Sequence, residues 1–163
     1  MTIAFFVAAA VAVLSTLMTI TRRNAVHALL YLVVSFFSIG LIFFVLGAPF
    51  VAALEVIVYA GAIMVLFLFV MMMLNVGKES ERQEAAWFDI RDWIGPFILA
   101  AILLGELIYL LVINKTAILQ GTVIQPGELG RVLFSQYFLG VEIASMVLLA
   151  GLVGAFHLGR RSR

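Results

Sequence analysis

The sequence predicts an all-α membrane protein with five transmembrane helices in a single transmembrane domain that covers residues 1–163. Two observations support this prediction. First, 65% of the residues are hydrophobic and only 12% are charged, which is too little polar surface for a soluble domain of this size. Second, five apolar segments approach the ~20 residues that a helix needs to cross a bilayer. We expect these helices at residues 2–20, 26–46, 51–74, 93–113 and 133–157.

The stretches between these spans contain residues that end helices. The first span lacks the basic start of a signal peptide and is followed directly by Arg22 and Arg23, so we expect it to be retained. A Gly-Ala-Pro turn at residues 47–49 is very short, so the second and third spans should be antiparallel neighbours. Two longer stretches, residues 76–92 and 114–132, separate the remaining spans.

The placement of Lys and Arg predicts the orientation, because cytoplasmic loops carry an excess of basic residues. With the N-terminus outside, only Lys115 and Arg131 lie on the outer side. The inner side then holds Arg22, Arg23, Lys78, Arg82, Arg91, Arg160, Arg161 and Arg163. The prediction is therefore a periplasmic N-terminus and a cytoplasmic C-terminus. Loop 76–92 is then cytoplasmic and loop 114–132 periplasmic.

The composition excludes several function classes. The chain has no cysteine, which excludes disulfides, thiolate metal sites and cysteine-ligated iron–sulfur clusters. His27 and His157 are too few for a His-rich metal or haem site in this chain alone. Both lie near cytoplasmic helix ends, where helix capping and headgroup contact are the ordinary roles. No phosphate-binding loop, dinucleotide fingerprint or nucleic-acid-binding basic run is present.

The third predicted span contains a carboxylate, Glu55. A carboxylate inside a membrane span normally faces a protein partner, a water-filled cavity or a proton path. Tyr59 lies four residues further on, on the same helix face. The functional interpretation is a protonatable or water-organising group, and the alternative is a hydrogen bond that serves packing alone. Small residues around Gly61 permit close packing or a local π-bulge, which is enriched at functional sites. A one-residue insertion would rotate the helix beyond it by ~100°.

Two further glutamates fall within predicted spans. The predicted topology places Glu142 nearly three turns deep, where it needs a partner from another helix or is neutral. A functional role and a structural hydrogen bond are both open for Glu142. Glu106 lies in the outer half of the fourth span with Tyr109 as its polar companion, and a structural role is favoured. Bulky side chains around the helices leave no hydrophilic lumen, so we expect a subunit embedded among other helices.

Three segments resemble a known family, the J subunits of respiratory NADH:quinone oxidoreductase, or complex I. The longest is AALEVIVYAGAIMVLFLFVMMMLN at residues 52–75, which resembles the third helix of that family. Residues 24–32, NAVHALLYL, resemble the family's NPVHALLYL, with Ala25 in place of proline. Residues 141–160 resemble the closing helix. The resemblance therefore covers most of the chain.

This resemblance implies an accessory membrane subunit of a proton-translocating NADH:quinone oxidoreductase in the bacterial inner (plasma) membrane. The chain itself would hold no cofactor, because FMN, the iron–sulfur clusters and quinone are bound by other subunits. Its partners would be the A, H, K and antiporter-like subunits and the lipid bilayer, with quinone acting only indirectly and no nucleic acid involved.

The resemblance also implies a switchable third helix that couples quinone reduction to proton translocation. A π-bulge would lie between Tyr59 and Val65, and its α/π interconversion would open or close a hydrated proton path. The residues assigned to this path and its gating are Glu55, Tyr59, Gly61, Val65 and Glu142.

Two alternatives remain open at this stage. The chain could be a purely structural assembly subunit, in which the glutamates only hydrogen-bond to neighbouring helices. It could also be the equivalent subunit of a related complex that receives electrons from ferredoxin or another donor, because the electron-input module lies on other chains.

Overall fold

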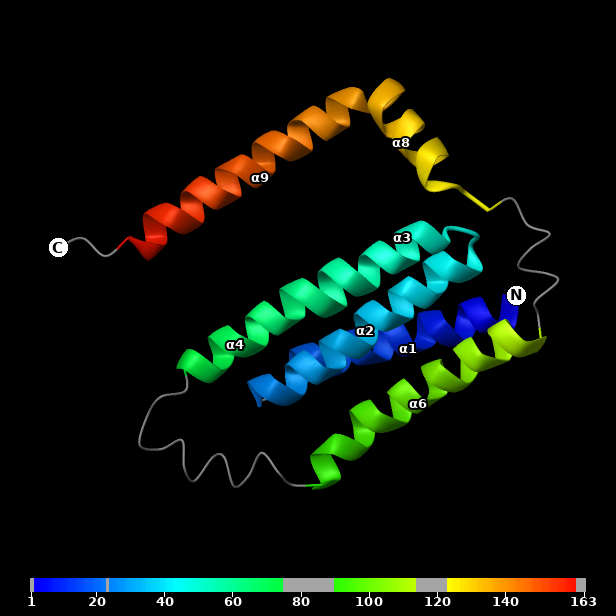
Figure 1. Ribbon diagram of the computed structural model, residues 1–163. Helices are drawn as coiled ribbons and strands as arrows, with labels where there is room; N and C mark the ends of the chain where they lie inside the picture. Colours follow the sequence, from blue (N-terminus) through cyan, green and yellow to red (C-terminus); the bar gives the residue numbers. More distant parts are fainter. Residues whose placement is uncertain (1, 23, 75–89, 114–122, 161–163) are drawn as a thin grey trace. The chain divides into compact units, whose positions relative to one another are not determined.

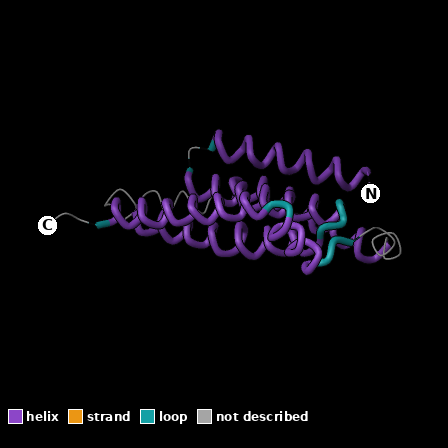
Figure 2. The backbone as a smooth tube through the Cα atoms, turned by 90° about the horizontal axis from the view of Figure 1, so that it is seen from above, coloured by secondary structure: helices purple, strands orange, loops and turns teal. Residues whose placement is uncertain are grey.

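The computed structural model describes residues 2–22, 24–74, 90–113 and 123–160, and every element among them is helical. Figure 2 shows helix throughout these parts, interrupted by short loops. In chain order the elements are α1 (Thr2–Thr21), α2 (Ala25–Val45), α3 (Pro49–Leu54), the π-helix η1 (Glu55–Ile63), α4 (Met64–Leu74), α6 (Ile90–Ile113), α8 (Pro126–Ser135) and α9 (Phe138–Gly159).

Five helical segments of the described chain are long and apolar enough to cross a membrane, which confirms the predicted all-helical, five-span fold. The third segment, Pro49–Met71, combines α3, η1 and most of α4. The predicted loop 76–92 lies outside the described residues except for residues 90–92, which begin α6. The membrane orientation and the single domain over residues 1–163 stay predictions.

The chain divides into two compact units, Met1–Val123 and Ile124–Arg163. In the first unit α2 is the central helix, because it contacts α1, the α3–η1–α4 segment and α6 (Figure 1). The core of this unit lies where α1, α2 and α6 meet. Its buried residues are Ala4, Ala8, Val11, Val34, Leu41, Leu103 and Leu110. The two alanines of α1 are small, which allows close helix approach.

Both ends of α2 are fixed by local hydrogen bonds. Asn24 caps the start, where its side chain accepts from the backbone N–H groups of Val26 and His27. At the other end Gly47 has a φ of 83°, the left-handed conformation that glycine adopts without strain. The N–H groups of Gly47 and Ala48 donate to two carbonyls of the last turn of α2, which is a Schellman motif. The predicted tight turn into the third span is thereby confirmed.

The last predicted span, residues 133–157, differs from the structure. A separate helix, α8, occupies Pro126–Ser135, a part of the chain that the prediction divided between the loop 114–132 and the span. The helix then breaks at Gln136 and Tyr137, and α9 begins at Phe138. Apolar residues on both sides of this break make the hydropathy continuous, so hydropathy alone misses it.

Candidate functional site

The third span has π geometry over Glu55–Ile63. The spacing of its backbone hydrogen bonds widens from four residues to five along the helix. The Glu55 N–H donates to the carbonyl of Val51, four residues earlier, whereas the Met64 N–H donates to that of Tyr59, five residues earlier. The segment contains Tyr59 but begins four residues before the predicted bulge, so Glu55 itself lies inside it.

Val65 is the site residue that lies outside the π segment. It belongs to the first turn of α4 and is 49% exposed. The π segment therefore overlaps the predicted bulge, Tyr59 to Val65, from Tyr59 to Ile63. Because Val65 follows the π segment, its direction depends on how many residues that segment holds in each turn.

Glu55 and Tyr59 both lie beside α2. A Cβ atom built on Gly40 of α2 would be 3.3 Å from Val56 Cγ2 and 3.9 Å from Glu55 Cγ. One turn earlier on α2, the Phe36 ring lies against the Tyr59 ring, with centroids 5.4 Å apart. The two helices approach closely at Gly40 because it has no side chain. The carboxylate and the phenol thus share the α2-facing side of the third span, as their spacing predicts.

Gly61 fits the π winding for a backbone reason. A Cβ atom built on Gly61 would lie 3.3 Å from the carbonyl oxygen of Val56, five residues earlier in the same helix. This is tighter than ordinary van der Waals contact, so the Val56 carbonyl would have to move by a few tenths of an ångström. Glycine therefore suits the π geometry at this position better than any residue with a side chain.

Glu142 lies in the second unit and is less deep in its helix than predicted. It is the fifth residue of α9, which begins at Phe138. At a rise of ~1.5 Å per residue, Glu142 lies ~6 Å beyond the helix start, about one turn rather than nearly three. Ser145 Oγ donates to the backbone carbonyl of Glu142 at 2.7 Å. The helix that contains Glu142 begins five residues later than the predicted span, and the depth of Glu142 in the membrane stays a prediction.

Glu106 of α6 is a polar group to which the sequence assigned no function. It lies one turn after Leu103 and one turn before Leu110, both of which belong to the core. Its Oε2 atom is buried and has no hydrogen-bond partner among the described residues. The sequence shows that Glu106 is a carboxylate within an apolar span. It does not show which side of the helix packs against the core, and so it could not predict that Oε2 would be buried.

A second polar group joins α1 to α2. Thr16 Oγ1 and Ser35 Oγ are 2.9 Å apart and form a hydrogen bond between the two helices. Ser15 and Ser38 are fully buried and donate to carbonyls of their own helices at 2.7 and 2.9 Å. Serine and threonine hydroxyls in helices commonly donate to a backbone carbonyl of the preceding turn in this way. We therefore assign these residues to helix packing and not to a functional site.

Three helix ends meet around Tyr31 of α2. Arg22 Nη2 donates to Tyr31 Oη at 3.3 Å, and the guanidinium lies 5.4 Å from the ring centroid. The Tyr31 hydroxyl lies so close to Gly95 of α6 that a Cβ atom there would collide with it. His27 is 2% exposed and contacts Trp93 edge-to-face. The expected headgroup contact of His27 is therefore wrong, because the residue is buried between helices.

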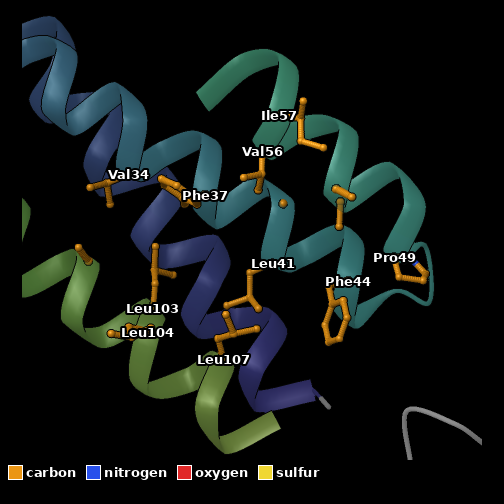
Figure 3. Close-up of a pocket in the computed structure, with 14 residues that line it drawn as sticks. Val34, Phe37, Leu41, Phe44, Pro49, Val56, Ile57, Leu103, Leu104 and Leu107 are labelled. Atoms are coloured by element: carbon orange, nitrogen blue, oxygen red, sulfur yellow. The ribbon is translucent and has the colours of Figure 1, made fainter. Parts of the chain in front are cut away.

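An apolar groove of about 720 Å³ lies between α2, the start of the third span and α6 (Figure 3). It is lined by apolar side chains such as Leu41, Val56 and Leu107 and by the backbone at Gly40. No three His, Asp or Glu side chains gather into a metal site among the described residues. The groove is lined by apolar surface, whereas Glu55, Tyr59, Glu106 and Glu142 are among the side chains of the described helices that can hold a proton.

These features define a multi-span α-helical membrane protein with carboxylates inside its spans and a π segment in the third. The family model described as NADH-ubiquinone/plastoquinone oxidoreductase chain 6 matches residues 15–158. NADH-quinone oxidoreductase subunit J of Escherichia coli (strain K12) is 53% identical over 164 residues, which is 100% of this chain and 89% of the relative.

Two further relatives agree. Subunit J of Pseudomonas aeruginosa is 52% identical over 162 residues, covering 99% of this chain and 98% of the relative. Subunit J of Buchnera aphidicola subsp. Schizaphis graminum is 45% identical over 159 residues, covering 98% of each. The chain belongs to the NADH-ubiquinone/plastoquinone oxidoreductase chain 6 family, which includes these subunit J proteins. The resemblance noted in the third span is confirmed.

Proposed function

We propose that this chain couples quinone reduction to proton translocation through its third transmembrane span. By its family it is a membrane subunit of NADH-quinone oxidoreductase, and its five apolar helices fit a multi-pass protein of the bacterial inner membrane. The observation that carries the coupling proposal is the π segment Glu55–Ile63, which holds a carboxylate, a phenol and a glycine.

The π segment can act as a switch because it contains one residue more than α winding would accommodate. Returning to α winding would rotate the helix beyond the segment by ~100° relative to the helix before it. Glu55 would stay beside Gly40, where the helices are in close contact. Val65 and the rest of α4 would turn to face different neighbours. Packed interfaces with two discrete arrangements are the usual elements of such transitions.

Proton transfer through this segment would use Glu55 and Tyr59. A carboxylate inside a membrane span normally pairs with a neighbour or faces a water-filled path. Both groups face α2 in the π state, and a change of winding would alter the distance between them. Glu142 is proposed as a further protonatable residue of the path, one turn inside its own helix.

The redox chemistry is assigned to other subunits. The chain has no cysteine to ligate an iron–sulfur cluster. FMN and the quinone are likewise proposed to be bound elsewhere in the complex. The partners proposed for this chain are the A, H, K and antiporter-like subunits. The relatives named for NADH-quinone oxidoreductase favour NADH over ferredoxin as the electron donor.

The coupling proposal is tested by Gly61→Val and Tyr59→Phe in the assembled enzyme, with quinone reduction and proton pumping measured separately. Valine at position 61 would crowd the Val56 carbonyl and favour α winding, so we expect fewer protons pumped per quinone reduced. Gly105→Val is the matched control, because a Cβ atom there meets nothing within 4 Å. Normal pumping in both variants, with intact assembly, would exclude gating by this segment.

Glu55→Gln separates this proposal from a purely structural role. Glutamine keeps the side-chain length and its hydrogen bonding but cannot exchange a proton at neutral pH. The coupling role predicts a loss of proton pumping with a normal amount of assembled enzyme. Full coupled activity would instead favour an assembly subunit whose glutamates only hydrogen-bond to neighbouring helices.

A further inference from the structure

Helix α8 has two chemically different faces. Glu128, Arg131 and Ser135 follow one another at intervals of three and four residues and so share one face. Leu129 and Leu133, two residues before and two after Arg131, occupy the opposite face, and Val132 lies at the boundary between the two faces. Phe134 lies at the other boundary, nearer to Arg131, and is 74% exposed. The helix is therefore amphipathic, unlike the membrane spans, which are apolar on all sides.

A helix as short as α8 needs an external surface to stabilise it. Isolated helices shorter than ~12–15 residues are marginal in water, and α8 has 10 residues. Within the second unit its apolar face is only partly covered, because Leu129 is half-buried and Leu133 is exposed there. What covers this face must be apolar on one side and must tolerate one acidic and one basic residue on the other.

The chain itself indicates what that surface is. Gln136 and Tyr137 alone separate α8 from α9, which is long and apolar enough to cross the membrane. Three Cα–Cα steps span at most about 11 Å, so the end of α8 lies close to the boundary where α9 begins. Figure 1 shows α8 turning sharply away from the direction of α9, so it does not continue that span. The exposed Tyr137 at the junction is a residue type enriched at membrane–water interfaces.

We propose that α8 lies in the membrane–water interface and binds the phospholipid surface. Leu129 and Leu133 face the acyl chains, and Glu128 and Arg131 face the headgroups and water. A polar face opposite an apolar one, with low overall hydrophobicity, is typical of interfacial helices. Anchored in this way, α8 fixes the depth at which α9 begins, and with it the depth of Glu142. This inference rests on the membrane spans alone and is independent of the coupling proposal.

Cysteine labelling in native membranes tests the placement. The chain has no cysteine of its own, so label recovered on this subunit reports only the introduced residue. Leu133→Cys is compared with Ser135→Cys, two residues further on and on the polar face. We expect a charged, membrane-impermeant maleimide to react about tenfold more slowly with the cysteine at position 133, because access limits the reaction of a thiol. A maleimide that dissolves in the bilayer should label position 133 readily. Equal reaction of both variants with the charged reagent would overturn the proposal.

A second measurement uses the unmodified enzyme and avoids any effect of substitution on folding. The complex is reconstituted with a phosphatidylcholine that carries a diazirine in its acyl chain near the headgroup, illuminated and analysed by mass spectrometry. We expect lipid adducts on the Leu129–Leu133 side of α8. Cross-links from that side to another protein segment, with no lipid adduct, would show that protein covers this face and would overturn the proposal.

Discussion

Three glycines of the first unit leave space for three different structural features. Gly40 lets α2 approach the third span, Gly61 accommodates the π winding, and Gly95 leaves room for the Tyr31 hydroxyl. Space is most restricted at Gly95, because a Cβ atom there would collide with the Tyr31 side chain of α2. The hydroxyl cannot retreat easily, because it also accepts a hydrogen bond from Arg22.

Gly95→Ala is expected to weaken the packing of α6 against α2. Overpacking of this kind typically costs about 1–3 kcal/mol, more than alanine gains over glycine through helix propensity, about 0.5–1 kcal/mol. The temperature at which this subunit is released from the purified complex should therefore fall. Gly105→Ala, in open space on the same helix, should leave that temperature unchanged or raise it. If both variants behave alike, Tyr31 does not restrict position 95.

At the scale of single elements, α2 depends on its first turn. The family pattern has a proline after Asn24, and this chain has Ala25 instead. The start of the helix therefore relies on the Asn24 side chain, whose Oδ1 accepts from the Val26 N–H at 2.9 Å. Because α2 contacts every other described helix of its unit, loosening this turn would affect the region where His27 contacts Trp93.

Asn24→Ala is expected to destabilise the start of α2 by about 1 kcal/mol, the usual contribution of an N-cap side chain. Amide hydrogen exchange in the intact complex should become faster at the first turn of α2. Asn24→Ser restores a capping oxygen and should return the exchange close to that of the native enzyme. Unchanged exchange in the alanine variant would show that neighbouring helices, and not the cap, hold this turn.

Much of the element order could be predicted because hydropathy reports directly on membrane spans. The turn around Gly47 and the first four spans follow from that signal and from residues that end helices. The break at Gln136 could not be predicted, because apolar residues flank it closely on both sides and keep the averaged hydropathy high. The contacts of Glu55 with Gly40 and of Tyr59 with Phe36 could not be predicted from the sequence either. They depend on how two helices pack, which the sequence of one helix does not specify.

At the scale of the whole molecule, α6 is held in the first unit by a small number of buried leucines. Leu110 is 1% exposed, and its neighbour Leu111 is 47% exposed. The core around Leu110 also includes the alanines of α1, which are too short to fill a space left by a truncated leucine. The pair therefore offers a matched comparison of buried and exposed positions on one helix.

Leu110→Ala is expected to destabilise the docking of α6 by about 2–5 kcal/mol, the range for large-to-small changes in a packed core. Less of this subunit should remain in the complex after purification in detergent, as measured by quantitative mass spectrometry. Leu111→Ala should have a much smaller effect. A similar loss in both variants would indicate that contacts with other subunits, rather than this core, retain α6.

The shallow position of Glu142 has an electrical consequence. With the membrane boundary at the start of α9, as proposed for the α8 anchor, a proton that reaches Glu142 from that surface passes ~6 Å into a hydrocarbon layer of ~30 Å, or about one fifth of its thickness. Moving a unit charge across the whole layer takes about 2.3 kcal/mol per 100 mV, so a potential of that size changes the free energy of a proton at Glu142 by only about 0.5 kcal/mol. The membrane voltage therefore acts only weakly at this point of α9, and most of the potential difference falls across the part of the helix beyond Glu142.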